Sequence, residues 1–220
     1  MKLRLGDREL NSNIILAPMA GVTDLPFRLL CHEQGAGMAV TEMVSAKAIL
    51  YKNKNTKELM AVDPAEGPVA VQLFGSDPEI MAEIAAQIED GPFAAIDVNM
   101  GCPVPKIVNN GEGSALMKDI KLAEKILTSM VKAVKKPVTV KFRKGFNDQC
   151  LNAVEFAKMA ESSGGSLGGR SWKDQGAVLF RHGRLGSDPS GKRGSEDTGD
   201  RKRRYLSCSG CGPDDAGNRL

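Results

Sequence analysis

The stretch 96-IDVNMGCPVP-105 decides the fold of this chain. It begins with mostly apolar residues, as does a strand buried in a sheet. Gly101 and Pro103 then interrupt it, because glycine permits unusual backbone angles and proline has no N–H for a strand ladder. We predict a buried strand ending in a tight loop that presents the Asn99 carboxamide and the Cys102 thiol. The carboxyl ends of parallel strands carry the chemistry of α/β enzymes, although a structural turn with a buried cysteine is the plainer alternative.

Overall composition indicates an ordinary globular protein. The 220 residues suit one domain, and the net charge of +3 indicates no particular partner. The oligomeric state stays open. The chain opens without a signal-peptide pattern and contains no apolar run long enough to cross a bilayer. We therefore expect a cytoplasmic protein with reduced thiols and no membrane partner. Cys208 and Cys211 lack a second pair or suitably spaced histidines, so no metal site is expected.

A change of composition divides the chain near residue 164. Residues 1–164 are rich in Ile, Met, Val and Ala, whereas residues 165–220 contain no Ile or Met but hold half of the 24 glycines. The first part sums to a charge of −1 and the second to +4. Such a shift marks a boundary. We predict a folded unit over 1–164 and a basic, Gly- and Arg-rich, disordered tail over 165–220.

Strand and helix patterns alternate through the first part. Apolar runs predict strands over residues 13–19, 38–43, 68–74, 94–99 and 137–143. Helical spacing and capping residues predict helices from Thr23 or Asp24 towards Gly35, from Ser45, and over residues 80–88, 113–117, 122–134 and 151–161. Nearly continuous apolar strands between helices indicate a parallel sheet covered by helices.

Five βα units with short links favour the first part of a (β/α)₈ TIM barrel, an α/β fold. A complete barrel needs about 250 residues, so this chain is short for one. A dinucleotide-binding fold is less well supported, because it requires G-x-G-x-x-G after the first strand, where this chain has APMAGVTD.

Distinctive residues lie at the carboxyl ends of the predicted strands. Gln72 and Lys141 each interrupt an apolar strand, where an unpaired polar group costs several kcal/mol. The full set is Pro18, Met19 and Ala20, then Glu42, Gln72, Asn99 with Cys102, and Lys141 with Arg143. Each has a plain structural explanation, such as a bond to a neighbouring backbone group. Together they predict one site for a polar, anionic, ring-bearing ligand such as a flavin phosphate.

Six segments, in this order and spacing, resemble the bacterial tRNA-dihydrouridine synthases: APMAGVTD, TEMVSA, VQLFGSDP, DVNMGCPVPK, GSALM and VKFRKG. The likeness covers residues 5–164. It implies a flavin-dependent (β/α)₈ barrel, followed by a helical domain that helps to grip tRNA. It also implies reduction of the C5–C6 double bond of uridine in tRNA, with FMN as cofactor and NADPH as reductant.

The resemblance also implies roles for individual residues. Cys102 would be the general acid, which suits a thiol because an ordinary thiol is protonated at neutral pH. The cofactor-binding residues would be Pro18, Met19 and Ala20 under the flavin ring, Gln72 at its pyrimidine edge and Lys141 near N1–C2. Asn99 and Arg143 would help to hold the target uracil, which must leave its stack to reach the site.

The tail departs from this family. After residue 164 the family continues with a sixth strand, a histidine motif and a phosphate-binding loop, where this chain has GSLGGRSWKDQG. Permitted codons for Ser171–Gly186, shifted by one base, read HGRTREQFYSGTADW, which resembles the histidine motif. The same shift over Gly199–Leu206 reads VTGNGDI, which resembles the phosphate loop. We therefore expect that a frameshift near residue 165 replaced the second half of the barrel.

Such a chain would bind FMN weakly and tend to aggregate, because a barrel cut after five strands exposes two sheet edges. Two other functions stay open. One is a truncated, non-catalytic protein that binds RNA through its basic tail. The other is a different flavin barrel that reduces a free pyrimidine or a small enone.

Overall fold

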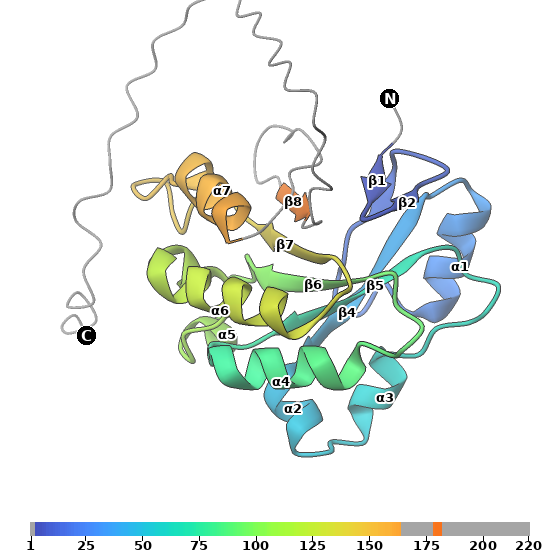
Figure 1. Ribbon diagram of the computed structural model, residues 1–220, viewed down its shortest axis with the longest axis horizontal. Helices are drawn as coiled ribbons and strands as arrows, with labels where there is room; N and C mark the ends of the chain where they lie inside the picture. Colours follow the sequence, from blue (N-terminus) through green and yellow to red (C-terminus); the bar gives the residue numbers. More distant parts are fainter. Residues whose placement is uncertain (1–2, 164–177, 182–220) are drawn as a thin grey trace, which may run out of the picture.

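The computed structural model describes residues 3–163 and 178–181 (Figure 1). A two-stranded hairpin is formed by β1 (Arg4–Leu5) and β2 (Arg8–Glu9). The main sheet contains β3 (Ile15–Leu16), β4 (Met38–Ser45), β5 (Val69–Phe74), β6 (Ala95–Met100), β7 (Val138–Phe142) and β8 (Val178–Arg181). The helices are α1 (Leu25–Glu33), α2 (Ala46–Leu50), α3 (Asn55–Leu59), α4 (Pro78–Ile88), α5 (Pro105–Val108), the 3₁₀ helix η1 (Gly113–Met117), α6 (Ile120–Ala133) and α7 (Ala153–Ser162).

The main sheet follows chain order from β3 to β8, and its first five strands are parallel. This order, with a helical crossover after each strand, is that of a TIM barrel opened after its first strands. The predicted fold class of residues 1–164 is therefore confirmed. The prediction missed the hairpin, α3 and α5, because short elements give little periodic signal. It also drew the first strand too long, since β3 comprises only two residues.

The two sides of the sheet carry different side chains. Helices α2, α4 and α6 cover one side, where Val71, Leu73, Val98, Val140 and other apolar residues form the main core (Figure 1). The opposite side corresponds to the interior of a barrel. At its amino end a smaller apolar cluster joins the hairpin to the sheet, through Leu5, Leu10, Met38, Val40, Ala70 and Ala95. The hairpin thus closes the end of the half-barrel that lies away from the expected site.

Strand β8 pairs with β7 antiparallel, with Lys141 opposite Leu179. A TIM barrel would continue with a parallel strand at this position. This strand falls within residues 165–220, the range of the predicted tail. The rest of the predicted tail, with its Cys208–Cys211 pair, lies outside the described residues.

Candidate active site

A layer of polar side chains lies above the smaller apolar cluster, on the interior side of the sheet. Parallel register places Gln72 of β5 beside Asp97 of β6, and Asp97 beside Thr139 of β7. Two residues further along, Asn99 lies beside Lys141. Because side chains alternate along a strand, all five belong to the face that carries Ala70 and Ala95 below. The expected grouping of Gln72, Asn99 and Lys141 is present in the structure.

Asp97 occupies the centre of this layer and is fully buried. Its Oδ2 accepts a hydrogen bond from Gln72 Nε2 at 2.6 Å, and its Oδ1 accepts one from Thr139 Oγ1 at 2.5 Å. The Gln72 backbone N–H donates to Thr41 Oγ1 of β4 at 3.0 Å, which fixes the start of the side chain. The two strands that flank β6 therefore both donate a hydrogen bond to one carboxylate.

Asn99 connects this layer to the loop after β6. Its Nδ2 donates to Gln72 Oε1 at 2.9 Å. Its Oδ1 accepts hydrogen bonds from the backbone N–H groups of Gly101 and Cys102, at 3.1 and 2.9 Å. The side chain therefore closes a local turn that sets the position of Cys102. In this structure Asn99 organises the loop as well as facing the expected site.

Burial at the site shifts two pKa values. Burial raises the pKa of Asp97 to about 6, although the bonds from Thr139 and Gln72 and the charge of Lys141 act in the opposite direction. Burial also lowers the pKa of Lys141, as does the neighbouring Arg143, whereas Asp97 and Cys102 raise it. Lys141 thus lies within electrostatic range of the Asp97 carboxylate and of the Cys102 thiol.

Two glycines allow the Cys102 loop to pack closely. A Cβ on Gly113, which has a φ of +60°, would lie 2.6 Å from the Cys102 carbonyl oxygen. That carbonyl accepts a hydrogen bond from the Ser114 N–H at 2.9 Å. A Cβ on Gly101 would lie 3.2 Å from Cγ of Arg143. The half-exposed Cys102 and Arg143 are therefore brought towards the same end of the sheet.

Pro18, Met19 and Ala20 lie in the loop between β3 and α1, and the Met19 side chain is 60% exposed. Thr23 closes this loop, since its Oγ1 accepts from the Met19 N–H at 3.0 Å and donates to the Met19 carbonyl at 3.2 Å. Glu42 lies within β4, three residues before the strand ends at Ser45, and its carboxylate accepts a hydrogen bond from the Gly21 N–H at 2.8 Å. This hydrogen bond ties the loop to the neighbouring strand β4.

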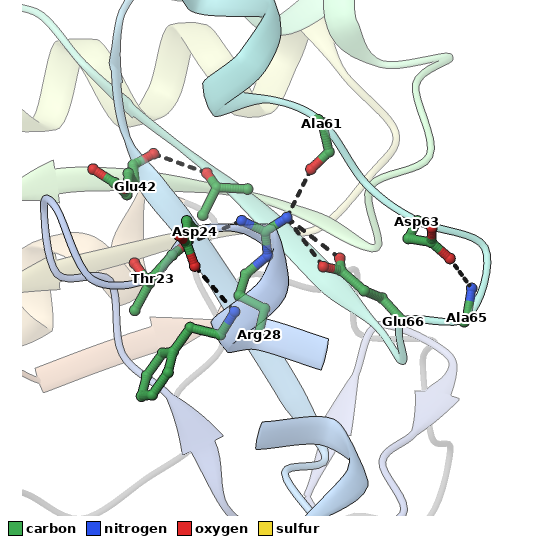
Figure 2. A network of polar contacts seen from close by, with 10 residues as sticks. Thr23, Asp24, Arg28, Glu42, Ala61, Asp63, Ala65 and Glu66 are labelled. Carbon is green, nitrogen blue, oxygen red and sulfur yellow. Dashed lines mark hydrogen bonds and ion pairs between the residues drawn. The ribbon is translucent and has the colours of Figure 1, made fainter. Parts of the chain in front are cut away.

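A buried ion pair supports this loop from the side (Figure 2). Arg28 of α1 is 2% exposed, and its Nη2 lies 3.1 Å from Oε1 of Glu66, whose side chain is fully buried. Its guanidinium also donates to the carbonyls of Thr23 and Ala61, at 3.0 and 2.7 Å. Burial raises the pKa of Glu66, and Arg28 opposes that rise. Arg28 thus joins the end of the Met19–Thr23 loop to the segment before β5.

Sequence reasoning missed four of these residues. Asp97 and Thr139 are polar residues inside apolar strands, the same signal that singled out Gln72 and Lys141. They could therefore have been found. The partners Arg28 and Glu66 are 38 positions apart, and no local pattern predicts that pairing.

The sequence profile of the dihydrouridine synthase family matches residues 15–167. This chain belongs to the dihydrouridine synthase family. It is 48% identical over 163 residues to the "probable tRNA-dihydrouridine synthase" of Rickettsia bellii. It is 44% and 43% identical, each over 162 residues, to the "tRNA-dihydrouridine synthase B" of Vibrio parahaemolyticus and of Pseudomonas aeruginosa. These alignments cover 74% of this chain and 49–50% of the relatives, so the chain spans about half the length of the curated relatives it matches.

Other expectations concern metals, membranes and thiols. Within the described ranges, no group of three or more His, Cys, Asp and Glu side chains is arranged to hold a metal ion. No helix there is long and apolar enough to cross a membrane. Cys31, Cys102 and Cys150 are in no disulfide.

Proposed function

We propose that this chain carries the ring-binding and proton-donating half of the active site of an FMN-dependent tRNA-dihydrouridine synthase. The complete enzyme would reduce the C5–C6 double bond of uridine in tRNA, with NADPH as reductant. One observation carries the proposal. The Cys102 thiol follows β6 in a loop held by Asn99, while Gln72 and Lys141 lie on the two flanking strands. Family membership and the names of the relatives support the same reaction.

The residues present fit the ring of FMN. An isoalloxazine ring offers alternating hydrogen-bond donors and acceptors along its pyrimidine edge, and it carries negative charge near N1–C2 when reduced. Gln72 presents an amide, which can both donate and accept. Lys141 presents a cation within electrostatic range of Cys102. In the loop at Pro18, Met19 and Ala20, Met19 and Ala20 are exposed, so a flat ring could contact this loop. When bound, reduced FMN would supply a hydride to C6 of the uracil.

The chain's own residues would complete the reduction. As C6 gains hydrogen, charge develops at C5 and on the C4 carbonyl of the uracil. Cys102 Sγ–H would donate the proton that C5 requires, as a general acid. Arg143, which packs beside Gly101 at the same loop, would bind the uracil or its ribose-phosphate. Asn99 would keep the loop, and with it the thiol, in place.

The turnover experiment compares Cys102→Ala with unaltered enzyme. It measures NADPH-dependent dihydrouridine formation in unmodified tRNA, using protein from a gene whose complete reading frame includes residues 1–164. We expect turnover to fall by about 10²-fold or more, the usual contribution of a general acid. FMN affinity should stay the same, because Cys102 supplies a proton rather than a ring contact.

Cys31→Ala is the matched control, because Cys31 is a free, partly exposed cysteine on α1, away from the loop. It should retain full turnover. Unchanged turnover in Cys102→Ala would refute the role of the thiol. Flavin binding with reduction of a free pyrimidine or enone, but not of tRNA, would favour a different flavin enzyme. RNA binding without flavin would favour a non-catalytic protein.

A further inference from the structure

The site contains a chain of hydrogen bonds that runs in one direction only. It starts at the Asp97 carboxylate, passes through the amides of Gln72 and Asn99, and ends at the backbone N–H groups of Gly101 and Cys102. A side-chain amide can be turned by 180°, which exchanges its donor and its acceptor. Both amides in this chain would be ambiguous if they stood alone.

The two ends of the chain remove that ambiguity. Backbone N–H groups can only donate, so the Asn99 oxygen must face the Cys102 loop. An ionised carboxylate can only accept, so the nitrogen of Gln72 must face Asp97. The two requirements agree, because the Gln72 oxygen is then left facing the Asn99 nitrogen, 2.9 Å away.

We propose that Asp97 is a positioning residue, whose buried carboxylate fixes the orientation of the Gln72 and Asn99 amides and, through Asn99, holds the loop that carries Cys102. This assignment rests on the proposed function for its catalytic meaning. Its geometry stands on the described residues alone. Thr139 completes the arrangement, because its hydroxyl donates to Oδ1 of Asp97 and leaves Oδ2 to accept from Gln72.

The test moves the carboxylate from one side of Gln72, at position 97, to the other side, at position 99. In Asn99→Asp, two carboxylates flank Gln72, whose single amide nitrogen cannot serve both. Adding Asp97→Asn should restore the match. Gln72 can then turn over and donate to the new acid, while its oxygen accepts from the new amide, and Thr139 still donates to that amide's oxygen. The single change Asp97→Asn should be tolerated, because the new amide can accept from Gln72 and donate to Thr139.

The readout is hydrogen exchange of the Gly101 and Cys102 amides in the full chain, at about pH 8, where ordinary carboxyl groups are ionised. We expect protection at these amides to fall by about tenfold or more in N99D, the loss expected for a buried acceptor left without a donor. It should return to within about threefold of the unaltered chain in D97N/N99D, and D97N should also stay within that range. Asn53→Asp is the matched control, because Asn53 also accepts from a nearby backbone N–H, that of Asn55, but at an exposed turn.

Rescue in the double variant would support the proposal. Unchanged protection in N99D, or a loss in D97N/N99D equal to the combined losses of the single variants, would overturn it. If N99D does not fold, a folded double variant counts as the rescue, and failure of both to fold overturns the proposal. The measurement needs neither FMN nor tRNA, so its failure and the failure of the proposed function are distinguishable.

Discussion

At the scale of single residues, Asp97 shows how a site can include a group that is costly to bury. A carboxylate with no exposed surface is tolerated here because Gln72, Thr139 and Lys141 offset part of the loss of hydration. The offset is incomplete, since the pKa of Asp97 still rises to about 6. The site therefore contains a group that weakens the fold when it ionises.

This raised pKa predicts a pH dependence of stability. The folded chain holds the Asp97 proton more tightly than the unfolded chain, so the free energy of unfolding falls as pH rises from about 4 to about 6. The loss from this group is about 3 kcal/mol, at about 1.4 kcal/mol per pH unit. Below that range the stabilisation is fully present. Asp97→Asn should remove this part of the dependence.

Urea unfolding at several pH values from about 4 to about 7 checks this prediction, with the difference between the unaltered chain and D97N as the quantity of interest. Glu66 and Glu112 also have raised pKa values. Their contributions cancel in that difference, because both chains retain them. Parallel curves for the two chains would show that Asp97 does not titrate in this window.

Residue type and position in a strand allowed much of the site to be predicted. Gln72 and Lys141 stood out because polar residues are rare in buried strands, and Cys102 because it follows Asn99 and Gly101 in a strand-breaking loop. Asn99 was expected to face the uracil. The structure adds that its oxygen holds the Cys102 loop, a role that depends on backbone conformation after the strand.

At the scale of elements, the close approach of η1 to the loop after β6 determines where Cys102 can lie. Gly113 makes this approach possible, since a side chain there would meet the Cys102 carbonyl. The segments that form this contact were both predicted from sequence, over residues 94–99 and 113–117. Their contact was not, because it depends on how η1 returns to the end of β6.

Gly113→Ala should therefore loosen the Cys102 loop. An alanine at this position would have to adopt a left-handed backbone, at a φ of +60°, and would displace the Cys102 carbonyl. Because the two costs add, we expect the free energy of unfolding to fall by more than about 2 kcal/mol. Hydrogen exchange at the Ser114 amide, which donates to that carbonyl, measures the effect directly.

Gly111→Ala is the matched control. Gly111 also has a positive φ, +73°, but the nearest atom to an added Cβ, on Ser76, is 4.0 Å away. This substitution should lower the free energy of unfolding by about 1 kcal/mol, from the backbone strain alone, and leave the Ser114 amide protected from hydrogen exchange. Equal protection of Ser114 in the two variants would show that the glycine contact does not position the loop.

At the scale of the whole molecule, the described sheet is half of a barrel with an open first edge. β3 is the terminal strand on that side, and exposed apolar side chains occur just before it, at Ile14, and after it in the following loop and α1, at Val22, Phe27 and Leu30. In a closed barrel this edge would be paired. The alternation of strands and helices allowed the fold to be predicted, whereas the antiparallel pairing of β8 could not be expected from a family pattern that is parallel at this position.

The frameshift hypothesis makes a prediction about the coding DNA. The region from codon 155 to beyond the stop codon should contain, one base out of frame, codons for the histidine motif and the phosphate loop. Sequencing both strands checks it. If the DNA shows that a base is missing from or extra in the sequence as read, the protein is a longer, intact enzyme, whereas a genuine shift would mean a damaged gene. The lack of any latent alternative frame would refute the hypothesis and leave the basic tail to be explained by a function of its own.

The most direct test of the central claim, that these residues form the ring-binding half of a flavin site, is an FMN titration of the full 220-residue chain. The account predicts weak but saturable binding that Lys141→Met weakens by about tenfold or more, since it removes a partly buried charge. Lys144→Met, which alters an exposed lysine paired with Asp148, should leave the affinity unchanged. No saturable binding, or binding that both variants leave unaltered, would contradict the account.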